Sequence, residues 1–388
     1  MSNQNATPSS VPLLDVNRGN QSLRNEILES IAEVVDSGRF LHGPQVGELE
    51  CTVAGICQTK QAIACASGSD ALLLALMALD IQHGDEVIVP SFTFFATASA
   101  VSRLGAIPVF VDIDPLTYNI SPDEIAANVT SRTKAIIPVH LFGQCAAMDK
   151  IEAIAKRHNI FVIEDAAQAI GAAYLGRPAG AWGDIGCLSF YPTKNLGGMG
   201  DGGMMVCNDA EMAAKLRLFA SHGMQPRYYH KFVGINSRLD TIQAAILNVK
   251  IAHLQSYSQA RQRNANRYAE LFAAEGLDQW IELPHHAPEA THVWNQYGIR
   301  VTNGLRDALR KHLNDTKIGN EVYYPVPLHL QECFEDLGYS LGCLPKTEKA
   351  SKEILHLPIY PDLTEREQDA VVASLKKFYS SATLRRAA

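Results

Sequence analysis

Residues 61–91 read QAIACASGSDALLLALMALDIQHGDEVIVPS: an apolar run, a turn of small residues, a helix-like stretch and a second apolar run. This order is typical of a βαβ unit, in which a helix joins two parallel strands. The alternation continues to about residue 210, with further strand candidates in IPVFVDI, KAIIPVH, FVIEDA, DIGCLSFYP and GGMMVCN. The sequence therefore predicts an α/β fold, a mostly parallel central sheet wrapped by helices, with its chemistry at the carboxyl ends of the strands.

The second half of the chain predicts a different architecture. Apolar positions recur at helical spacing from Leu239 to about Phe272, which indicates one long helix bridging two domains. A strand pattern, VWNQYGIRV, a proline-rich turn, YYPVPLHL, and a final helix opened by a capping box from Thr364 to Glu367 follow. We expect a large α/β domain with an N-terminal arm over residues 1–250 and a small α+β domain over residues 251–388.

Composition excludes several function classes. The 388 residues carry 34 Lys plus Arg against 41 Asp plus Glu, a formal charge of −7 without a basic run, so we expect no nucleic-acid binding. No segment reaches the roughly 18 apolar residues of a membrane span and the start has no leader-like pattern, which predicts a cytoplasmic protein. The eight cysteines include no C-x-x-C pair and no H-E-x-x-H occurs, so we expect free, mostly buried thiols and no metal.

Two polar residues stand out at the predicted sheet edge. Asp165 follows the apolar run FVIE, and from this segment alone an aspartate that caps a following helix is the favoured interpretation. Lys194 lies in SFYPTKNLGGMGDGG, residues 189–203, where glycines let the backbone pass close to a planar ligand. A lone lysine is more often solvated, but this setting indicates chemistry.

The turn at residues 67–70 predicts an anion site, because free N–H groups and the helix dipole favour negative charge at a helix start. Ser189 adds a hydroxyl suited to a phosphate oxygen. A lysine, a carboxylate and an anion site together fit pyridoxal 5'-phosphate (PLP). The lysine amine condenses with the aldehyde of PLP, and the carboxylate keeps its ring nitrogen protonated so that the ring accepts electrons from the substrate.

Five segments in this order, PSFTFFATASAV, VHLFGQCAAMD, IEDAAQAIGA, SFYPTKNLGGMGDGG and GINSRLDTIQAAIL, closely resemble the sugar aminotransferase family called DegT/DnrJ/EryC1/StrS. The resemblance covers nearly the whole chain. It implies the PLP-dependent transferase fold of aspartate aminotransferase (fold type I) and a homodimer with active sites at the subunit interface. The implied reaction moves an amino group from an amino acid, commonly glutamate, to a keto-sugar nucleotide.

The resemblance also implies roles for single residues. Lys194 is expected to form the Schiff base and to carry the substrate proton, and Asp165 is expected to pair with the ring nitrogen, which makes both catalytic. Gln168 is expected near the ring hydroxyl, and Phe94 is expected to stack on the ring. Phosphate contacts are expected from Gly68, Ser69, Asp70 and Ser189, and from Asn236 of the neighbouring subunit.

The sugar is suggested by VFVDIDPLTYNI and RYYHKFVGINSRLD, which look most like the branch that aminates C3 of UDP-2-acetamido-2-deoxy-3-oxo-glucuronate for surface polysaccharides. A carboxylated, doubly phosphorylated substrate favours nearby cations. Arg227, Lys231 and Arg238 are candidates, each equally suited to a surface charge or a structural salt bridge. Tyr324 and His329 match a segment that lines the sugar site in relatives, and a packed turn histidine is the alternative for His329.

Other functions stay open. The acceptor could be a dTDP-3-keto or a UDP-4-keto-6-deoxy sugar. A regulatory or sensor protein that retains the fold is the non-enzyme alternative, against which the acidic balance argues. GMGDGG, residues 198–203, formally matches the dinucleotide-binding pattern G-x-G-x-x-G, but it leads into a strand rather than a helix, so an oxidoreductase is disfavoured.

Overall fold

A seven-stranded sheet with the strand order β1–β9–β8–β5–β4–β2–β3 forms the centre of the protein, in a computed structural model that describes residues 8 and 10–386. Strand β9 runs antiparallel to β1 and β8, and the other neighbours are parallel. The predicted mostly parallel sheet is confirmed, and each strand candidate between residues 61 and 210 lies in it. The strands are β1 (Gln61–Cys65), β2 (Glu86–Pro90), β3 (Ile107–Val111), β4 (Thr133–Ile136), β5 (Phe161–Asp165), β8 (Ile185–Ser189) and β9 (Gly203–Cys207).

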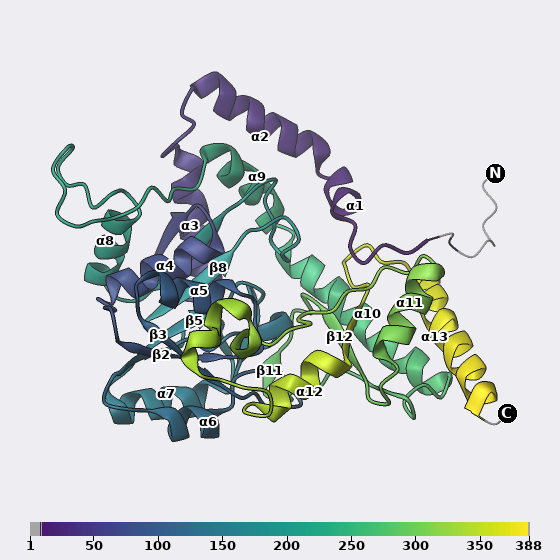
Figure 1. Cartoon of the computed structure of the whole chain (residues 1–388). Coiled ribbons are helices and arrows are strands. Elements are labelled where there is room, and N and C mark those ends of the chain that lie inside the picture. Colours follow the sequence, from purple (N-terminus) through teal and green to yellow (C-terminus); the bar gives the residue numbers. More distant parts are fainter. Residues whose placement is uncertain (1–7, 9, 387–388) are drawn as a thin grey trace.

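Helices cover both faces of this sheet (Figure 1). Strand β2 is buried along its whole length because water is excluded from both sides, which explains its continuous apolar run. One core includes Val53 of α3 and Leu247 of α9, and the other includes Leu74 of α4 and Leu216 of α8. The helices of this domain are α3 (Pro44–Cys57), α4 (Gly68–Ala78), α5 (Ala96–Arg103), α6 (Pro122–Asn128), α7 (Met148–His158), α8 (Ala210–Phe219) and α9 (Thr241–Ile251).

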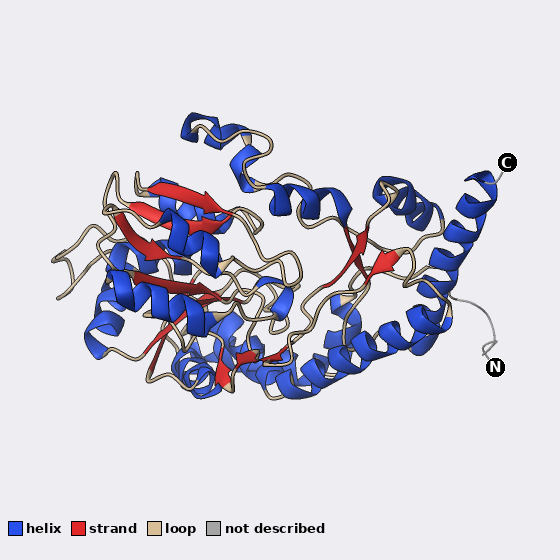
Figure 2. Ribbon diagram, turned by 90° about the horizontal axis from the view of Figure 1, so that it is seen from below, coloured by secondary structure: helices blue, strands red, loops and turns tan. Residues whose placement is uncertain are grey.

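A second, antiparallel sheet with the order β10–β12–β13 belongs to the small C-terminal part, which Figure 2 shows beside the large sheet with its own helices. This confirms the α+β pattern, while the division at residue 250 stays a prediction. The elements are α10 (Leu254–Ala274), β10 (Ile281–Glu282), β12 (Tyr297–Val301), α11 (Arg306–Asp315), α12 (Pro345–Glu353), β13 (Ile354–Leu357) and α13 (Glu365–Arg386). The short strands β6 (Ala173–Tyr174), β7 (Arg177–Pro178) and β11 (Ala290–Thr291) form a third sheet, and 3-10 turns occupy Leu141–Gly143, Leu328–Leu330 and Glu332–Leu337.

The N-terminal arm touches both parts of the chain. Its backbone at Val11 exchanges hydrogen bonds with Lys317 and Gly319 of the small domain. The helices α1 (Val16–Gln21) and α2 (Arg24–Ser37) follow, and Ile27 of α2 packs against Ile246 of α9.

The single long helix predicted from Leu239 to Phe272 is wrong. Two helices, α9 and α10, occupy this stretch and are separated by a turn at Ala252 and His253. Leu247 of α9 is buried in the large domain, whereas Phe272 of α10 is buried in the small one. The turn lets the two apolar faces meet different cores, and the sequence contains no glycine or proline there to mark it.

The final helix begins as predicted. Thr364 N–H donates to Glu367 Oε2 at 2.8 Å, and Glu367 N–H donates to Thr364 Oγ1 at 3.3 Å. Ser121 also precedes a helix, α6, but within the described chain its side chain makes no capping hydrogen bond.

All eight cysteines lie in the described chain and are free thiols, and those at 57, 65, 145, 187 and 207 are buried. Among residues 8 and 10–386, no helix is long and apolar enough to cross a membrane.

Candidate active site

Five of the predicted site residues lie at or after the carboxyl ends of strands in the large sheet. Gly68 follows β1, Phe94 follows β2, and Asp165 ends β5. Ser189 ends β8, and Lys194 lies in the loop after it. Because these strands point the same way, the fold gathers residues from distant segments at one edge of the sheet.

Lys194 is half-buried at this edge. Burial lowers the pKa of its amine to about 8, and the attraction of the Asp165 carboxylate opposes that effect. An amine with such a pKa loses its proton more easily than a solvated lysine, so Lys194 can act as a nucleophile.

The glycine-rich loop after Lys194 is held by helix α9. The buried Lys250 ammonium donates to the carbonyl of Gly197, and Met199 N–H donates to Gln243 Oε1 at 2.8 Å. Burial lowers the pKa of Lys250 to about 8. Sequence reasoning missed this lysine, and the signal for it was a charge four residues after Ile246, in the apolar stripe of the predicted helix.

Asp165 is 5% exposed, and both of its carboxylate oxygens accept hydrogen bonds. The Thr97 hydroxyl donates to Oδ2 at 2.8 Å, and Ala167 N–H donates to Oδ1 at 3.2 Å. Burial raises the pKa of Asp165, while these two hydrogen bonds and the attraction of Lys194 lower it. Residues 166–172 form turns rather than a helix, so the interpretation of Asp165 as a helix cap is wrong.

Gln168 and two aromatic residues lie around this carboxylate. Gln168 Oε1 accepts from Phe142 N–H at 2.7 Å, and its side chain also hydrogen-bonds Tyr324. The ring of Tyr324 lies 6.3 Å from that of Phe94, measured between centroids. Phe94 is 58% exposed, so its ring is available to a planar ligand.

The turn between β1 and α4 presents the start of a helix, which favours an anion. Ser67 caps α4 by accepting from Asp70 N–H at 3.1 Å, and the first N–H groups of a helix lack partners within it. A Cβ atom on Gly68 would lie 2.7 Å from Ser189 Cβ, so only glycine lets these two segments approach. Ser69 is exposed at the same turn.

Glu164 is the residue beside Asp165 on β5, and successive residues of a strand point to opposite faces. Its carboxylate accepts from His140 Nε2 at 2.8 Å, and Ala146 N–H donates to His140 Nδ1 at 3.2 Å, which places the ring proton on Nε2. Three backbone N–H groups also donate to it, from Gly180, Trp182 and Gly183. This buried network, which sequence reasoning missed, fixes the strand that carries Asp165.

The candidate substrate cations Arg227, Lys231 and Arg238, and the candidate phosphate contact Asn236, lie on the loop between α8 and α9, which Figure 1 shows projecting from the large domain. The Arg227 guanidinium lies 4.9 Å from the ring centroid of Tyr228, and Lys231 Nζ donates to Gln225 Oε1 at 3.0 Å. These contacts stay within the loop. Asn236 is exposed, and Arg238 is half-buried.

His329 is 2% exposed, and its ring is engaged on both sides. Nδ1 lies 2.7 Å from Ser91 Oγ, and Nε2 lies 3.4 Å from Glu348 Oε1. Burial lowers the pKa of the His329 ring, and Glu348 opposes this. The structure therefore places His329 where it holds the segment with Tyr324 against the end of β2.

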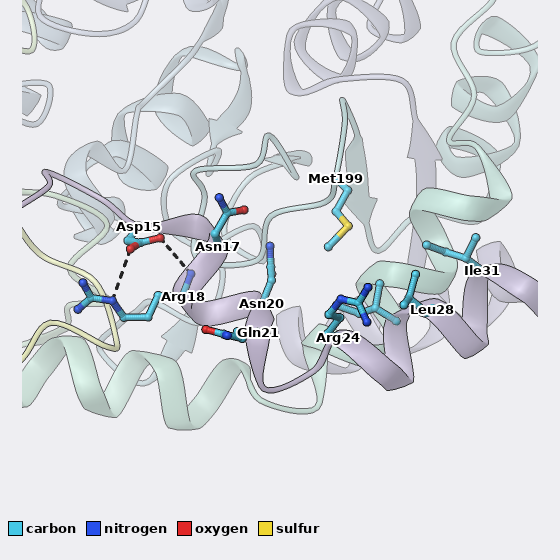
Figure 3. Close-up of a pocket in the computed structure, with 10 residues that line it drawn as sticks. Asp15, Asn17, Arg18, Asn20, Gln21, Arg24, Leu28, Ile31 and Met199 are labelled. Atoms are coloured by element: carbon cyan, nitrogen blue, oxygen red, sulfur yellow. Dashed lines mark hydrogen bonds and ion pairs between the residues drawn. The ribbon is translucent and has the colours of Figure 1, made fainter. Parts of the chain in front are cut away.

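A cavity of about 600 Å³ lies between the N-terminal arm and the loop after Lys194. Figure 3 shows Met199 of that loop opposite Arg24 and Leu28 of α2. None of the predicted cofactor residues lines this cavity. In the described chain, no group of three or more His, Cys, Asp or Glu could hold a metal ion.

Comparison with known proteins places this geometry among aminotransferases. The model of the DegT/DnrJ/EryC1/StrS aminotransferase family matches residues 21–376. A pleiotropic regulatory protein of Geobacillus stearothermophilus is 49% identical, with 95% of this chain and 98% of that protein covered. A UDP-N-acetyl-3-dehydro-alpha-D-glucosamine 3-aminotransferase of Acidithiobacillus ferrooxidans is 46% identical, with 95% and 97% covered.

Two further matches are a relative whose name gives its substrate and a solved structure that contains its cofactor. A UDP-2-acetamido-2-deoxy-3-oxo-D-glucuronate aminotransferase of Pseudomonas aeruginosa is 40% identical, with 94% of this chain and 99% of that protein covered. The crystal structure of NtdA from Bacillus subtilis with bound cofactor PMP superimposes with a TM-score of 0.89 at 36% identity, with 97% of this chain and 86% of that chain covered.

Proposed function

The chain belongs to the DegT/DnrJ/EryC1/StrS aminotransferase family, and from this premise we propose that it moves an amino group from glutamate to C3 of UDP-2-acetamido-2-deoxy-3-oxo-glucuronate, for surface polysaccharide synthesis. The observation that carries the proposal is the pair of Asp165, a buried carboxylate, and Lys194, an amine whose pKa burial lowers to about 8, at one sheet edge.

The residues at this edge fit PLP, the cofactor of the family. The Lys194 amine suits an aldehyde and the Asp165 carboxylate suits a protonated ring nitrogen, while the start of α4, with Gly68 close to Ser189, suits a phosphate. When bound, PLP supplies a carbon that bonds to amines and a ring that withdraws electrons from the substrate carbon bearing the amine.

The proposed roles of the protein groups follow from their placement. Lys194 in its unprotonated form would hold the cofactor, and its free amine would take the proton from the amine-bearing carbon of the substrate. Asp165 holds the proton on the ring nitrogen, and Gln168 orients the ring hydroxyl. Phe94 covers one face of the ring. The phosphate is bound by Ser189 and the turn at residues 68–70.

The sugar assignment rests on chemistry at C6 and on the relatives. A glucuronate carries a carboxylate there, and a half-buried cation, Arg238, lies on the loop that also carries Arg227 and Lys231. Tyr324 is the proposed contact to the sugar ring. His329 belongs to the same segment as Tyr324. It affects sugar binding by holding Tyr324 in place.

A UDP-linked 3-oxo-glucosamine is the second candidate acceptor, because the relative that acts on it is 46% identical, against 40% for the glucuronate enzyme. The two acceptors differ at C6, where a hydroxymethyl replaces the carboxylate. The regulatory name of the Geobacillus relative keeps a sensor role as the non-enzyme alternative.

The proposal includes a cytoplasmic homodimer in which Asn236 contacts the phosphate of the neighbouring site. Exposed apolar side chains support an interface on the loop between α8 and α9, where Tyr228 is 75% exposed and Val233 is 93% exposed. Leu28, in the wall of the cavity beside the N-terminal arm, is 46% exposed.

If the sites are shared, mixing inactive Asn236→Ala and Lys194→Ala chains should restore activity in mixed dimers, to about a quarter of the wild-type level for random pairing. Activity that stays absent, with mixed dimers present, would contradict a shared site.

The reaction is tested by visible absorbance. Purified protein incubated with PLP should show the band of a lysine-bound cofactor, lose it with glutamate and regain it with one 3-oxo sugar nucleotide, whereas Lys194→Ala should show no lysine-bound band. The acceptors are UDP-linked 3-oxo-glucuronate and 3-oxo-glucosamine. Arg238→Ala should raise KM for the carboxylated acceptor only. A wild type without the band, combined with tight, salt-sensitive DNA binding, would favour the regulator.

A further inference from the structure

The hydroxyl of Thr97 is in direct contact with Asp165. Thr97 lies in the first turn of α5, is 0% exposed, and donates from Oγ1 to Asp165 Oδ2 at 2.8 Å. Its oxygen lies 3.3 Å from Oγ1 of Thr93, itself 2% exposed. A hydroxyl has one proton, so a Thr97 that donates to the carboxylate accepts from Thr93. The two threonines therefore form a short buried chain of hydrogen bonds that ends on Asp165.

These hydrogen bonds determine which lone pairs remain free on the Asp165 carboxylate. A carboxylate accepts at about four lone-pair sites. Thr97 occupies one on Oδ2, and Ala167 N–H occupies one on Oδ1, with a longer contact of 3.2 Å. The hydroxyl is thus the shorter of the two contacts that fix the plane of the carboxylate and leave its remaining lone pairs for a ligand.

We infer that Thr97 is a positioning residue, whose hydroxyl, polarised by Thr93, holds the Asp165 carboxylate charged and oriented toward the ring nitrogen of PLP. The inference rests on the role proposed above for Asp165. Burial works against the charged carboxylate, and a hydroxyl donor offsets this because it stabilises the charged form. Chains of hydrogen bonds polarise one another, so Thr93 strengthens the donor.

Other ionisable groups face the same carboxylate. Lys194 from the loop after β8 attracts its charge, and the ring of His140 lies near it in the segment after β4. Cys187 of β8 and Tyr324 also interact with it, and each remains neutral more readily because of it. A change at Thr97 leaves all four groups in place, so a shift in the behaviour of Asp165 can be attributed to the hydroxyl.

Two substitutions separate the hydroxyl from the packing of Thr97. Thr97→Val keeps the branched shape and removes the donor, whereas Thr97→Ser removes the methyl group and keeps the donor. If the donor matters, the protein reconstituted from its apo form should bind PLP at least tenfold more weakly in Thr97→Val and within about threefold of wild type in Thr97→Ser. Thr93→Val should change binding in the same direction by a smaller factor.

A second readout reports on the ring nitrogen itself. In protein loaded with ¹⁵N-labelled PLP, the nitrogen resonance of Thr97→Val should move toward that of an unprotonated pyridine, and that of Thr97→Ser should stay at the wild-type position. The acid limb of the kcat profile should move to higher pH in Thr97→Val, because loss of the donor raises the pKa of Asp165. Circular dichroism checks that each variant is folded.

Asp165→Asn distinguishes a failure of the role proposed for Asp165 from a failure of the role inferred for Thr97. If Asp165→Asn leaves the nitrogen resonance unchanged, the proposed role of Asp165 is wrong. If Asp165→Asn moves the resonance but Thr97→Val does not, or if Thr97→Ser is the more damaging change, Thr97 serves packing alone and the inference is overturned.

Discussion

Replacing Lys250 by methionine should make the stability of the protein depend less on pH. Lys250 is 7% exposed, and its ammonium donates to the carbonyl of Gly197 in the loop after Lys194. Burial lowers its pKa from 10.5 to about 8. Between these two values the unfolded chain binds more protons than the folded chain, so the free energy of unfolding rises with pH.

The size of the effect follows from the two pKa values. From about pH 7 to about pH 9.5, deprotonation of Lys250 should raise the stability of the wild type by about 2 kcal/mol. Lys250→Met lacks this contribution. At neutral pH the two proteins should differ by no more than about 1 to 2 kcal/mol, because the variant loses a hydrogen bond but no longer buries a charge.

Urea unfolding at fixed protein concentration, at several pH values, measures this difference. The stability of the wild type minus that of Lys250→Met should grow by about 2 kcal/mol toward high pH. Asn248→Ala, which removes a non-ionisable side chain of the same helix and its hydrogen bond to Gln45 O at 3.0 Å, should show a constant difference. A constant difference for Lys250→Met as well would refute the reasoning, because the lysine would then have the same proton affinity in the folded and unfolded chains.

Three further substitutions test other contacts. Gly68→Ala places a Cβ atom 2.7 Å from Ser189 Cβ, so PLP affinity should fall at least tenfold, and an unchanged dissociation constant would show that the turn can widen freely. Glu164→Gln turns an amide toward buried backbone N–H groups and should lower the free energy of unfolding in urea by about 3 kcal/mol or more. A decrease below about 1 kcal/mol would show that the network contributes little to stability. Thr364→Ala removes the cap of α13 and should cost about 1 kcal/mol, which thermal unfolding would detect.

The sheet could be predicted from the sequence because burial on both faces requires continuous apolar runs such as that of β2. The position of the site followed from the same pattern, since Asp165 and Lys194 each come after such a run. Parallel strands then bring their carboxyl ends together without any further information from the sequence.

Features that depend on tertiary contacts could not be predicted. The turn between α9 and α10 exists because two cores compete for one amphipathic stretch, and no local residue marks it. The ring of His329 is engaged by Ser91, 238 residues away, so no local pattern distinguishes it from a ligand-binding histidine. Thr97 lies within the motif PSFTFFATASAV, but its partner became identifiable only because the fold brings the first turn of α5 to the end of β5.

Burial acts in opposite directions on the two central groups of the site. It lowers the pKa of Lys194 and raises the pKa of Asp165, so it favours the neutral form of both, while their mutual attraction favours the charged forms. The chemistry proposed here needs a neutral amine beside a charged carboxylate, a combination that neither burial nor attraction produces alone. Hydrogen bonds to Asp165 offset the effect of burial on the carboxylate, because they stabilise its charge, while burial keeps the pKa of Lys194 low. The donors from Thr97 and Ala167 are therefore where this fold sets the two ionisations apart.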